Sequence, residues 1–108
     1  MRQVQDSLRE HYADSNLTIG AVAQAFHVSS AYLSQEYKLQ TGEHPSDYLI
    51  SLRMEKAKEL LRDTELPIKE IALQVGYYDA SSFIRRFKKN TSVTPAQYRQ
   101  SVQRQPGA

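Results

Sequence analysis

Residues 68–99 read IKEIALQVGYYDASSFIRRFKKNTSVTPAQYR and contain two short helical patterns separated by a turn. In the first pattern, the apolar residues Ile68, Ile71 and Val75 recur three and four positions apart, which places them on one face of an α-helix. A turn follows at residues 76–78, where a glycine precedes two tyrosines. This order of elements predicts a helix-turn-helix unit.

The second helix of this unit is expected to begin after Asp79, whose side chain can accept a hydrogen bond from a backbone N–H of the first turn. Phe83 and Phe87 lie four positions apart and are expected to face the core. Thr94 and Gln97 have the spacing of a capping box, which predicts the start of a last helix.

The same plan occurs once more, earlier in the chain. In the first helix of each unit the matched residues are 49 positions apart: Leu17 with Leu66, Ile19 with Ile68, Val22 with Ile71, and Ala23 with Ala72. One extra residue in the later turn changes the offset to 50, and the next matches are Leu33 with Phe83, Tyr37 with Phe87, Lys38 with Lys88, Pro45 with Pro95, and Tyr48 with Tyr98. The repeat predicts two units of one all-α fold. The alternative is a bundle of α-hairpins in which the repeat reflects packing alone.

Two helices are expected before the first turn. Apolar residues recur every fourth position from Val4 to Tyr12 and predict an amphipathic helix over residues 2–14. Thr18 is a suitable cap for the next helix, although Gly20 weakens that helix by about 1 kcal/mol relative to alanine.

The first unit continues with a helix that the pair Ser29–Ser30 can cap and that Gly42 can end in the left-handed conformation. Pro45 suits the first turn of a long helix that runs to about Asp63. At 1.5 Å per residue, its roughly 19 residues span about 28 Å. The expected organisation is a single domain at 1–108, with a first unit at 1–44, a joining helix at 45–63, a second unit at 64–103 and a frayed tail at 104–108.

The composition excludes several kinds of site. The chain has no cysteine, which rules out disulfides, thiolate metal sites and cysteine nucleophiles. Its histidines, His11, His27 and His44, lie far apart and outside any HExxH motif, so neither a metal cofactor nor an enzyme is expected. No apolar run approaches the roughly 20 residues of a membrane span, and residues 1–16 lack the apolar core of a signal peptide. We therefore expect a cytoplasmic protein with no cofactor and no membrane partner.

The formal net charge of +2 is divided unevenly along the chain. Residues 79–108 hold six basic residues and one acidic residue, whereas residues 1–78 hold eight basic and eleven acidic residues. The positions left exposed on the helix after Asp79 are Ser81, Ser82, Arg85, Arg86 and Lys89. Short side chains let a helix approach the major groove, and arginine pairs with guanine edges. This face predicts binding to double-stranded DNA, and the alternative is a solvated basic helix.

These residues together resemble the C-terminal signature of the AraC/XylS family of bacterial transcription regulators. The resemblance is carried by Ile68 to Ala72, Val75 to Tyr77, Asp79, Ser82, Phe83, Arg86 to Lys89, Thr94, Pro95, Tyr98 and Arg99. It extends to the first unit and to the joining helix, through Arg53, Ala57, Leu60 and Leu61, and so covers nearly the whole chain.

The resemblance implies about seven helices and two recognition helices that enter successive segments of the major groove. The positions that match the family's base-contacting residues are Ala31, Ser34, Gln35, Ala80, Ser81 and Arg85. The candidate phosphate contacts are Ser30, Lys38, Ser82, Arg86, Lys88 and Lys89. The family commonly joins this domain to a sensing domain in a larger regulator, and RNA polymerase is a further expected partner.

The chain departs from the family pattern at Ser92 and Gln35. Ser92 stands where the family usually has the glycine that ends the second recognition helix, so we expect either a left-handed serine or a different turn. Gln35 stands where arginine is frequent. Residues 29–42 carry no net charge, whereas residues 79–92 sum to +3. The hypothesis is that the second unit supplies most of the electrostatic affinity and the first reads DNA through neutral contacts.

A protein-interaction module is the alternative function. A helix-turn-helix domain of that kind would contact a partner such as RNA polymerase, and the aromatic pair Tyr77–Tyr78 could serve in the contact. Salt distinguishes the two functions, because about four to six phosphate contacts give a slope of roughly −4 to −5 in a plot of log affinity against log salt.

Overall fold

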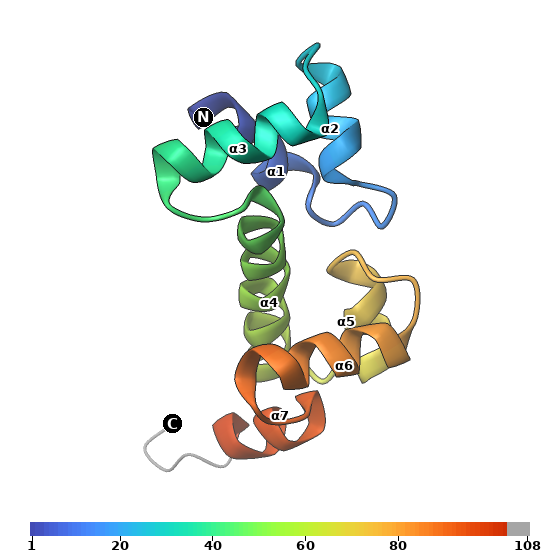
Figure 1. Cartoon of the computed structure of the whole chain (residues 1–108). Coiled ribbons are helices and arrows are strands. Elements are labelled where there is room, and N and C mark those ends of the chain that lie inside the picture. The colour runs from blue at the N-terminus through green and yellow to red at the C-terminus, as the bar shows by residue number, and fades with distance from the viewer. Residues whose placement is uncertain (104–108) are drawn as a thin grey trace.

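The computed structural model describes residues 1–103, which form seven α-helices and no strand (Figure 1). The helices are α1 (Arg2–His11), α2 (Ile19–Ala25), α3 (Ser30–Thr41), α4 (Pro45–Asp63), α5 (Ile68–Gln74), α6 (Ala80–Thr91) and α7 (Pro95–Gln103). The predicted all-α class is confirmed, and α4 has the bounds expected of the joining helix. The tail that was predicted to fray, at 104–108, lies outside the described residues.

Side-chain caps begin four of the helices where the sequence predicts them. Thr18 accepts a hydrogen bond from the backbone N–H of Ala21 at 3.0 Å, Ser29 from that of Tyr32 at 3.0 Å, and Asp79 from that of Ser82 at 2.8 Å. Thr94 and Gln97 form the reciprocal capping box, with N···O distances of 2.9 and 3.1 Å. Each cap satisfies a backbone donor that the first turn of a helix leaves unpaired.

The first helix is shorter than predicted, because α1 ends at His11 and not at Asp14. The Asp14 carboxylate accepts the backbone N–H of Asn16 at 2.9 Å, which closes a turn. The backbone carbonyls of Tyr12 and Asp14 then accept hydrogen bonds from the Arg53 side chain at 2.8 and 3.1 Å. The prediction was wrong here because the partner of these carbonyls lies far away in the sequence.

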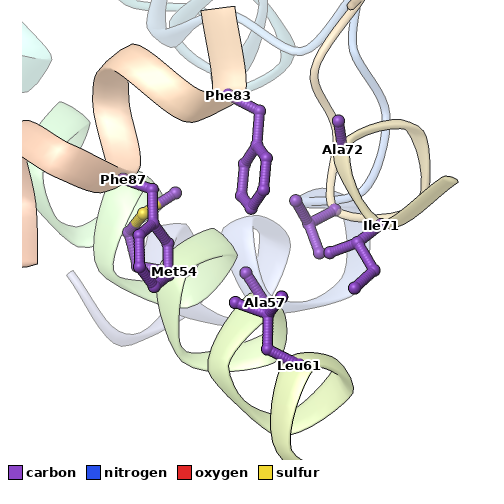
Figure 2. Packing of buried hydrophobic residues seen from close by; sticks show 8 residues of the cluster. Met54, Ala57, Leu61, Ile71, Ala72, Phe83 and Phe87 are labelled. Atoms are coloured by element: carbon purple, nitrogen blue, oxygen red, sulfur yellow. The ribbon is translucent and has the colours of Figure 1, made fainter. Parts of the chain in front are cut away.

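Two hydrophobic clusters lie at opposite ends of α4. The first contains Val4, Leu8, Val22, Ala23, Leu33, Tyr37 and Leu49. The second contains Met54, Ala57, Leu61, Ile71, Ala72, Val75, Phe83 and Phe87. Figure 2 shows Phe83 and Phe87 reaching from α6 toward Met54 and Ala57 on α4. Burying a phenylalanine of this kind contributes about 1.5–3 kcal/mol, so the phenylalanine pair fixes the position of α6 on α4.

The long helix α4 belongs to both units and is not only a connector between them. Arg53 donates to the carbonyl of Tyr12 at the end of α1, and Gln103 on α7 donates to the carbonyl of Leu61 at 3.2 Å. Arg53 and Gln103 are 50 residues apart, and Tyr12 and Leu61 are 49 apart, so the two contacts are repeats of one another. The first half of α4 therefore corresponds to α7, and its second half corresponds to α1.

Ser92 adopts the left-handed conformation at the end of α6, with φ 71° and its backbone N–H bonded to the carbonyl of Lys88 at 2.7 Å. Gly42 ends α3 in the same way, with φ 84° and a hydrogen bond to the carbonyl of Lys38 at 2.8 Å. The turn is therefore conserved between the units, and the serine replaces the glycine without changing it.

Ser92→Gly is expected to raise Tm by about 4–8 °C, because glycine relieves a left-handed strain of about 1 kcal/mol. Gly42→Ala is the matched control, since a Cβ at Gly42 would have no atom within 4 Å and would introduce strain alone. We expect it to lower Tm by a similar amount. Thermal unfolding followed by circular dichroism measures both changes, and an unchanged or lower Tm for Ser92→Gly would contradict the strain argument.

Candidate nucleic-acid interface

The second helices of the two units, α3 and α6, occupy equivalent places in the fold. They lie at opposite ends of α4 and run in the same direction across the view, with their N-termini on the same side (Figure 1). The molecule is elongated, with extents of 48 × 25 × 21 Å. One turn of B-DNA measures roughly 34 Å, so the long dimension is sufficient for two helices to reach neighbouring major-groove segments.

The outward face of α6 is small and polar at its N-terminal end and cationic further along. Phe83 and Phe87 face the core, and the side of the helix away from them carries Ser81, Arg85, Lys88 and Lys89, all exposed. Ala80, Ser82 and Arg86 are half-buried at its edges. All seven predicted contact residues of the second unit thus lie on one exposed side of α6 or along its borders.

The N-terminus of α6 carries the single acidic residue of this helix region. Asp79 accepts the backbone N–H of Ser82, and this hydrogen bond lowers the pKa of the carboxyl group below its usual value. The positive charge of Arg85 acts in the same direction. Asp79 is therefore ionised at neutral pH and serves as a helix cap.

Arg86 differs from its cationic neighbours because it is half-buried, whereas Arg85, Lys88 and Lys89 are exposed. It lines one hollow with Asp47 and Ile50 of α4 and with Lys89. A second hollow joins Arg86 to Tyr77, Ser82 and Arg85. Truncation of Arg86 would therefore disturb packing as well as charge, which makes Arg85 and Lys89 the better residues for testing a charge effect.

The cations of α6 have no acidic partner among residues 1–103. The ion pairs within residues 1–103 lie on α1 and α4, and their basic members are Arg9, His11, Lys56, Lys58 and Arg62. Arg85, Arg86, Lys88 and Lys89 take part in none of them. Such charges remain available to an external anion.

The outward face of α3 is neutral and partly apolar. The predicted residues Ser30, Ala31, Gln35 and Lys38 are exposed, and Ser34 is half-buried. Tyr32 and Leu39 also lie on this face and were not predicted from the sequence. Tyr32 is 55% exposed, and Leu39 is 73% exposed. Leu39 lines a shallow hollow with Ser34, Gln35, Lys38 and His44.

The repeat itself could have identified Tyr32 and Leu39. At an offset of 50, Tyr32 corresponds to Ser82 and Leu39 corresponds to Lys89, two positions already selected on the second helix. The same offset pairs Gln35 with Arg85 and Glu36 with Arg86, so three cations of α6 have no counterpart on α3. The two faces are thus equivalent in place and unequal in charge.

Comparison of the chain with known proteins identifies its family. A family described as "Helix-turn-helix domain" matches residues 22–101. The chain belongs to the AraC/XylS family. It is 39% identical to the uncharacterized HTH-type transcriptional regulator YijO of Escherichia coli strain K12 over 94% of this chain. It is 37% identical over 86% of its length to the HTH-type transcriptional activator RhaS of Escherichia coli O139:H28.

Solved structures of the family have the same fold. The C-terminal domain of the response regulator yesN from Fusobacterium nucleatum matches with a TM-score of 0.88 and 45% identity, over 91% of this chain and 95% of that chain. The C-terminal domain of AraT, a response regulator from Geobacillus stearothermophilus, matches with a TM-score of 0.92 and 40% identity, over 99% of this chain and 88% of that one. The DNA-binding domain of AdpA, solved with a target DNA, shares the fold at 22% identity, with a TM-score of 0.88 over 99% of this chain and 96% of that chain.

The chain spans about a third of the curated relatives named above, 36% of YijO and 33% of RhaS. Among the described residues, no group of three histidine, aspartate or glutamate side chains has an arrangement that could hold a metal ion. No helix within residues 1–103 has both the length and the apolar character needed to cross a membrane.

Proposed function

We propose that this AraC/XylS-family domain binds duplex DNA at specific sequences and thereby regulates transcription. In this proposal α3 and α6 enter successive segments of the major groove on one side of the DNA. The observation that carries it is the row of cations on the exposed side of α6, which form no ion pair within residues 1–103 and lie at the far end of α4 from a second helix of the same plan. A row of this kind suits the phosphate backbone beside a groove.

The residues divide into two roles within this proposal. Those assigned to base edges are Ala31, Ser34 and Gln35 on α3, and Ala80, Ser81 and Arg85 on α6. Those assigned to phosphates are Ser30 and Lys38 on α3, and Ser82, Arg86, Lys88 and Lys89 on α6. Arg85 is exposed on the outward face of α6, and its planar guanidinium favours guanine, whose O6 and N7 accept two parallel hydrogen bonds.

We further propose that the domain acts within a larger bacterial regulator that also carries a sensing domain. The lengths of YijO and RhaS support this, as does the origin of the yesN and AraT domains in response regulators. Contact with RNA polymerase would then accompany DNA binding. The cations of α6, which have no acidic partner in the described part of the chain, favour DNA binding over a module that contacts protein alone.

Selection of bound sequences from a random duplex pool tests the proposed function. We expect a bipartite site whose halves lie about 10–11 base pairs apart, since each half occupies one major-groove segment. The affinity for this site should fall with salt, with a slope of roughly −4 to −5 in a plot of log affinity against log salt. Failure to retain any duplex at low salt would exclude DNA binding and favour the protein-interaction module.

A further inference from the structure

We infer that a contact between the two units, which we call the inter-unit junction, sets the spacing of the two half-sites that the domain accepts. The junction consists of Tyr12, Asn16, Arg53, Gly76 and Tyr78. This inference rests on the proposed DNA binding. It adds a determinant of specificity that makes no contact with a base. The direct link is a hydrogen bond from the hydroxyl of Tyr78 to Oδ1 of Asn16 at 2.6 Å, between residues 62 positions apart.

The junction lies beside α4, away from its helical axis. Figure 1 shows the loop after α1, in blue, next to the turn before α6, in light orange, on one side of α4. Long helices are rarely straight and curve gently, so α4 alone does not fix the angle between the units. A second attachment at a distance from that helix opposes the bending, so the junction acts as a brace between the units.

Arg53 connects the brace to α4 and contacts both units. Its side chain is buried, with 9% of its surface exposed. It donates from Nε to the carbonyl of Tyr12 at 2.8 Å, and its guanidinium carbon lies 5.3 Å from the centre of the Tyr77 ring. The attraction between a cation and the face of an aromatic ring is strongest where water is excluded. One α4 residue therefore holds the end of α1 and the turn before α6 together.

Gly76 brings the two units into direct backbone contact. A Cβ atom at this position would lie 2.5 Å from the carbonyl oxygen of Tyr12 and 2.8 Å from Nε of Arg53. Both distances are shorter than any ordinary contact between such atoms, so only glycine permits this approach. The junction thus has no room for a side chain at position 76.

Tyr77 transmits the position of the junction to α6. Its ring lies 5.8 Å from that of Phe83, and it lines the same hollow as Arg85. Its hydroxyl is buried and has no hydrogen-bond partner among the described residues. Burial raises the pKa of this hydroxyl, and the nearby charge of Arg53 partly offsets the change. A displacement at the junction would consequently move the proposed base-reading face.

A fixed geometry between the units has a measurable consequence for DNA. One added base pair moves one half-site by about 3.4 Å and turns it by about 34° relative to the other. A braced domain cannot follow both changes and should lose contacts at one half. A domain without the brace can bend at α4 and retain them.

The experiment measures affinity for the selected duplex and for duplexes whose half-sites are one base pair closer or further apart. For the wild type we expect a loss of about thirtyfold at either altered spacing. For Asn16→Ala/Tyr78→Phe we expect an unchanged Tm and a loss of only about threefold at the same spacings. Both side chains are exposed, and Tyr78 is 69% exposed, so the substitutions leave the cores intact.

Tyr48→Phe is the matched control, because it removes a tyrosine hydroxyl that accepts a hydrogen bond from Arg9 at 2.9 Å, between α1 and the start of α4 and away from the junction. It should retain the spacing dependence of the wild type. Arg53→Lys keeps the charge but loses the planar fork, and it should relax the spacing dependence further while lowering Tm.

The outcomes separate the two proposals. A wild type that binds no duplex would overturn the DNA-binding proposal and this inference with it. A wild type that binds, and a double variant with the same spacing dependence, would overturn the inference alone. Equal affinity of the wild type for all three spacings would also overturn it.

Discussion

The double variant Arg85→Gln/Lys89→Leu is expected to bind its selected duplex about a hundredfold less tightly than the wild type at about 0.1 M salt. These substitutions give α6 the residues that α3 has at the equivalent positions, Gln35 and Leu39. The loss of Arg85 removes the proposed base contact, and a contact of that kind is worth about 1–3 kcal/mol. The loss of Lys89 removes the proposed phosphate contact and should reduce the magnitude of the salt slope by about 0.9.

The reverse exchange, Gln35→Arg/Leu39→Lys, should strengthen binding. Both side chains are exposed on the outward face of α3, and Leu39 is not part of either hydrophobic cluster. We expect about tenfold higher affinity for duplexes of any sequence and a slope steeper by about 2. Filter binding or fluorescence anisotropy over a range of salt concentrations measures both pairs of variants.

Lys56→Gln/Lys58→Gln supplies the matched control, with the same change of net charge at a different place. These lysines pair with Glu59 and Glu55 on α4 at 3.4 and 3.5 Å, and they line a hollow away from α6. The affinity should stay within about threefold of the wild type, because salt screens charges beyond about 10 Å. An equal loss in the control would show that net charge alone determines affinity and that α6 has no special role.

The inequality of the two units was predictable from the sequence, because charge and repeat offset require no coordinates. The start of α4 was predictable too, since a proline such as Pro45 suits the first turn of a helix. The full set of buried residues on α4 was not predictable. Arg53 and Met54 are buried there, and neither was predicted, because a buried arginine is recognisable only when its carbonyl partners on another element are known.

The charged part of the candidate interface could be proposed from the sequence alone. Arg85 and Lys89 belong to a basic cluster, so the pattern of charge identifies them. Tyr32 and Leu39 lie on the same face of α3, yet apolar residues at helical spacing resemble a core stripe and were not selected. The inter-unit junction was not predictable at all, since Tyr78 and Asn16 are 62 positions apart.

Gly76→Ala is expected to destabilise the domain by about 3 kcal/mol or more, which corresponds to a fall in Tm of about 10 °C or more. Gly76 has φ 104°, a conformation in which any Cβ is strained. The added methyl would also meet the carbonyl oxygen of Tyr12 and Nε of Arg53, so it must break the hydrogen bond between them. That would leave Nε of the buried Arg53 and the carbonyl of Tyr12 without their hydrogen bond, which is the larger part of the expected effect.

The first unit contains the matched control for this argument. His27 stands 49 residues before Gly76, also has a positive φ, of 61°, and ends α2 as Gly76 ends α5. In both turns the next backbone N–H donates to a carbonyl five residues earlier, from Val28 to Ala23 at 3.0 Å and from Tyr77 to Ala72 at 2.9 Å. His27 is exposed, so the first turn tolerates a side chain that the second, pressed against Arg53, cannot.

His27→Gly should therefore raise Tm by about 4–8 °C through relief of about 1 kcal/mol of left-handed strain, whereas Gly76→Ala lowers it. Chemical denaturation followed by circular dichroism gives both free energies of unfolding. Equal and opposite changes of about 1 kcal/mol would mean that backbone strain accounts for both turns and that the contact with Arg53 adds nothing. If Gly76→Ala lowers the free energy of unfolding by much more than His27→Gly raises it, the difference measures what the second turn contributes by holding the two units together.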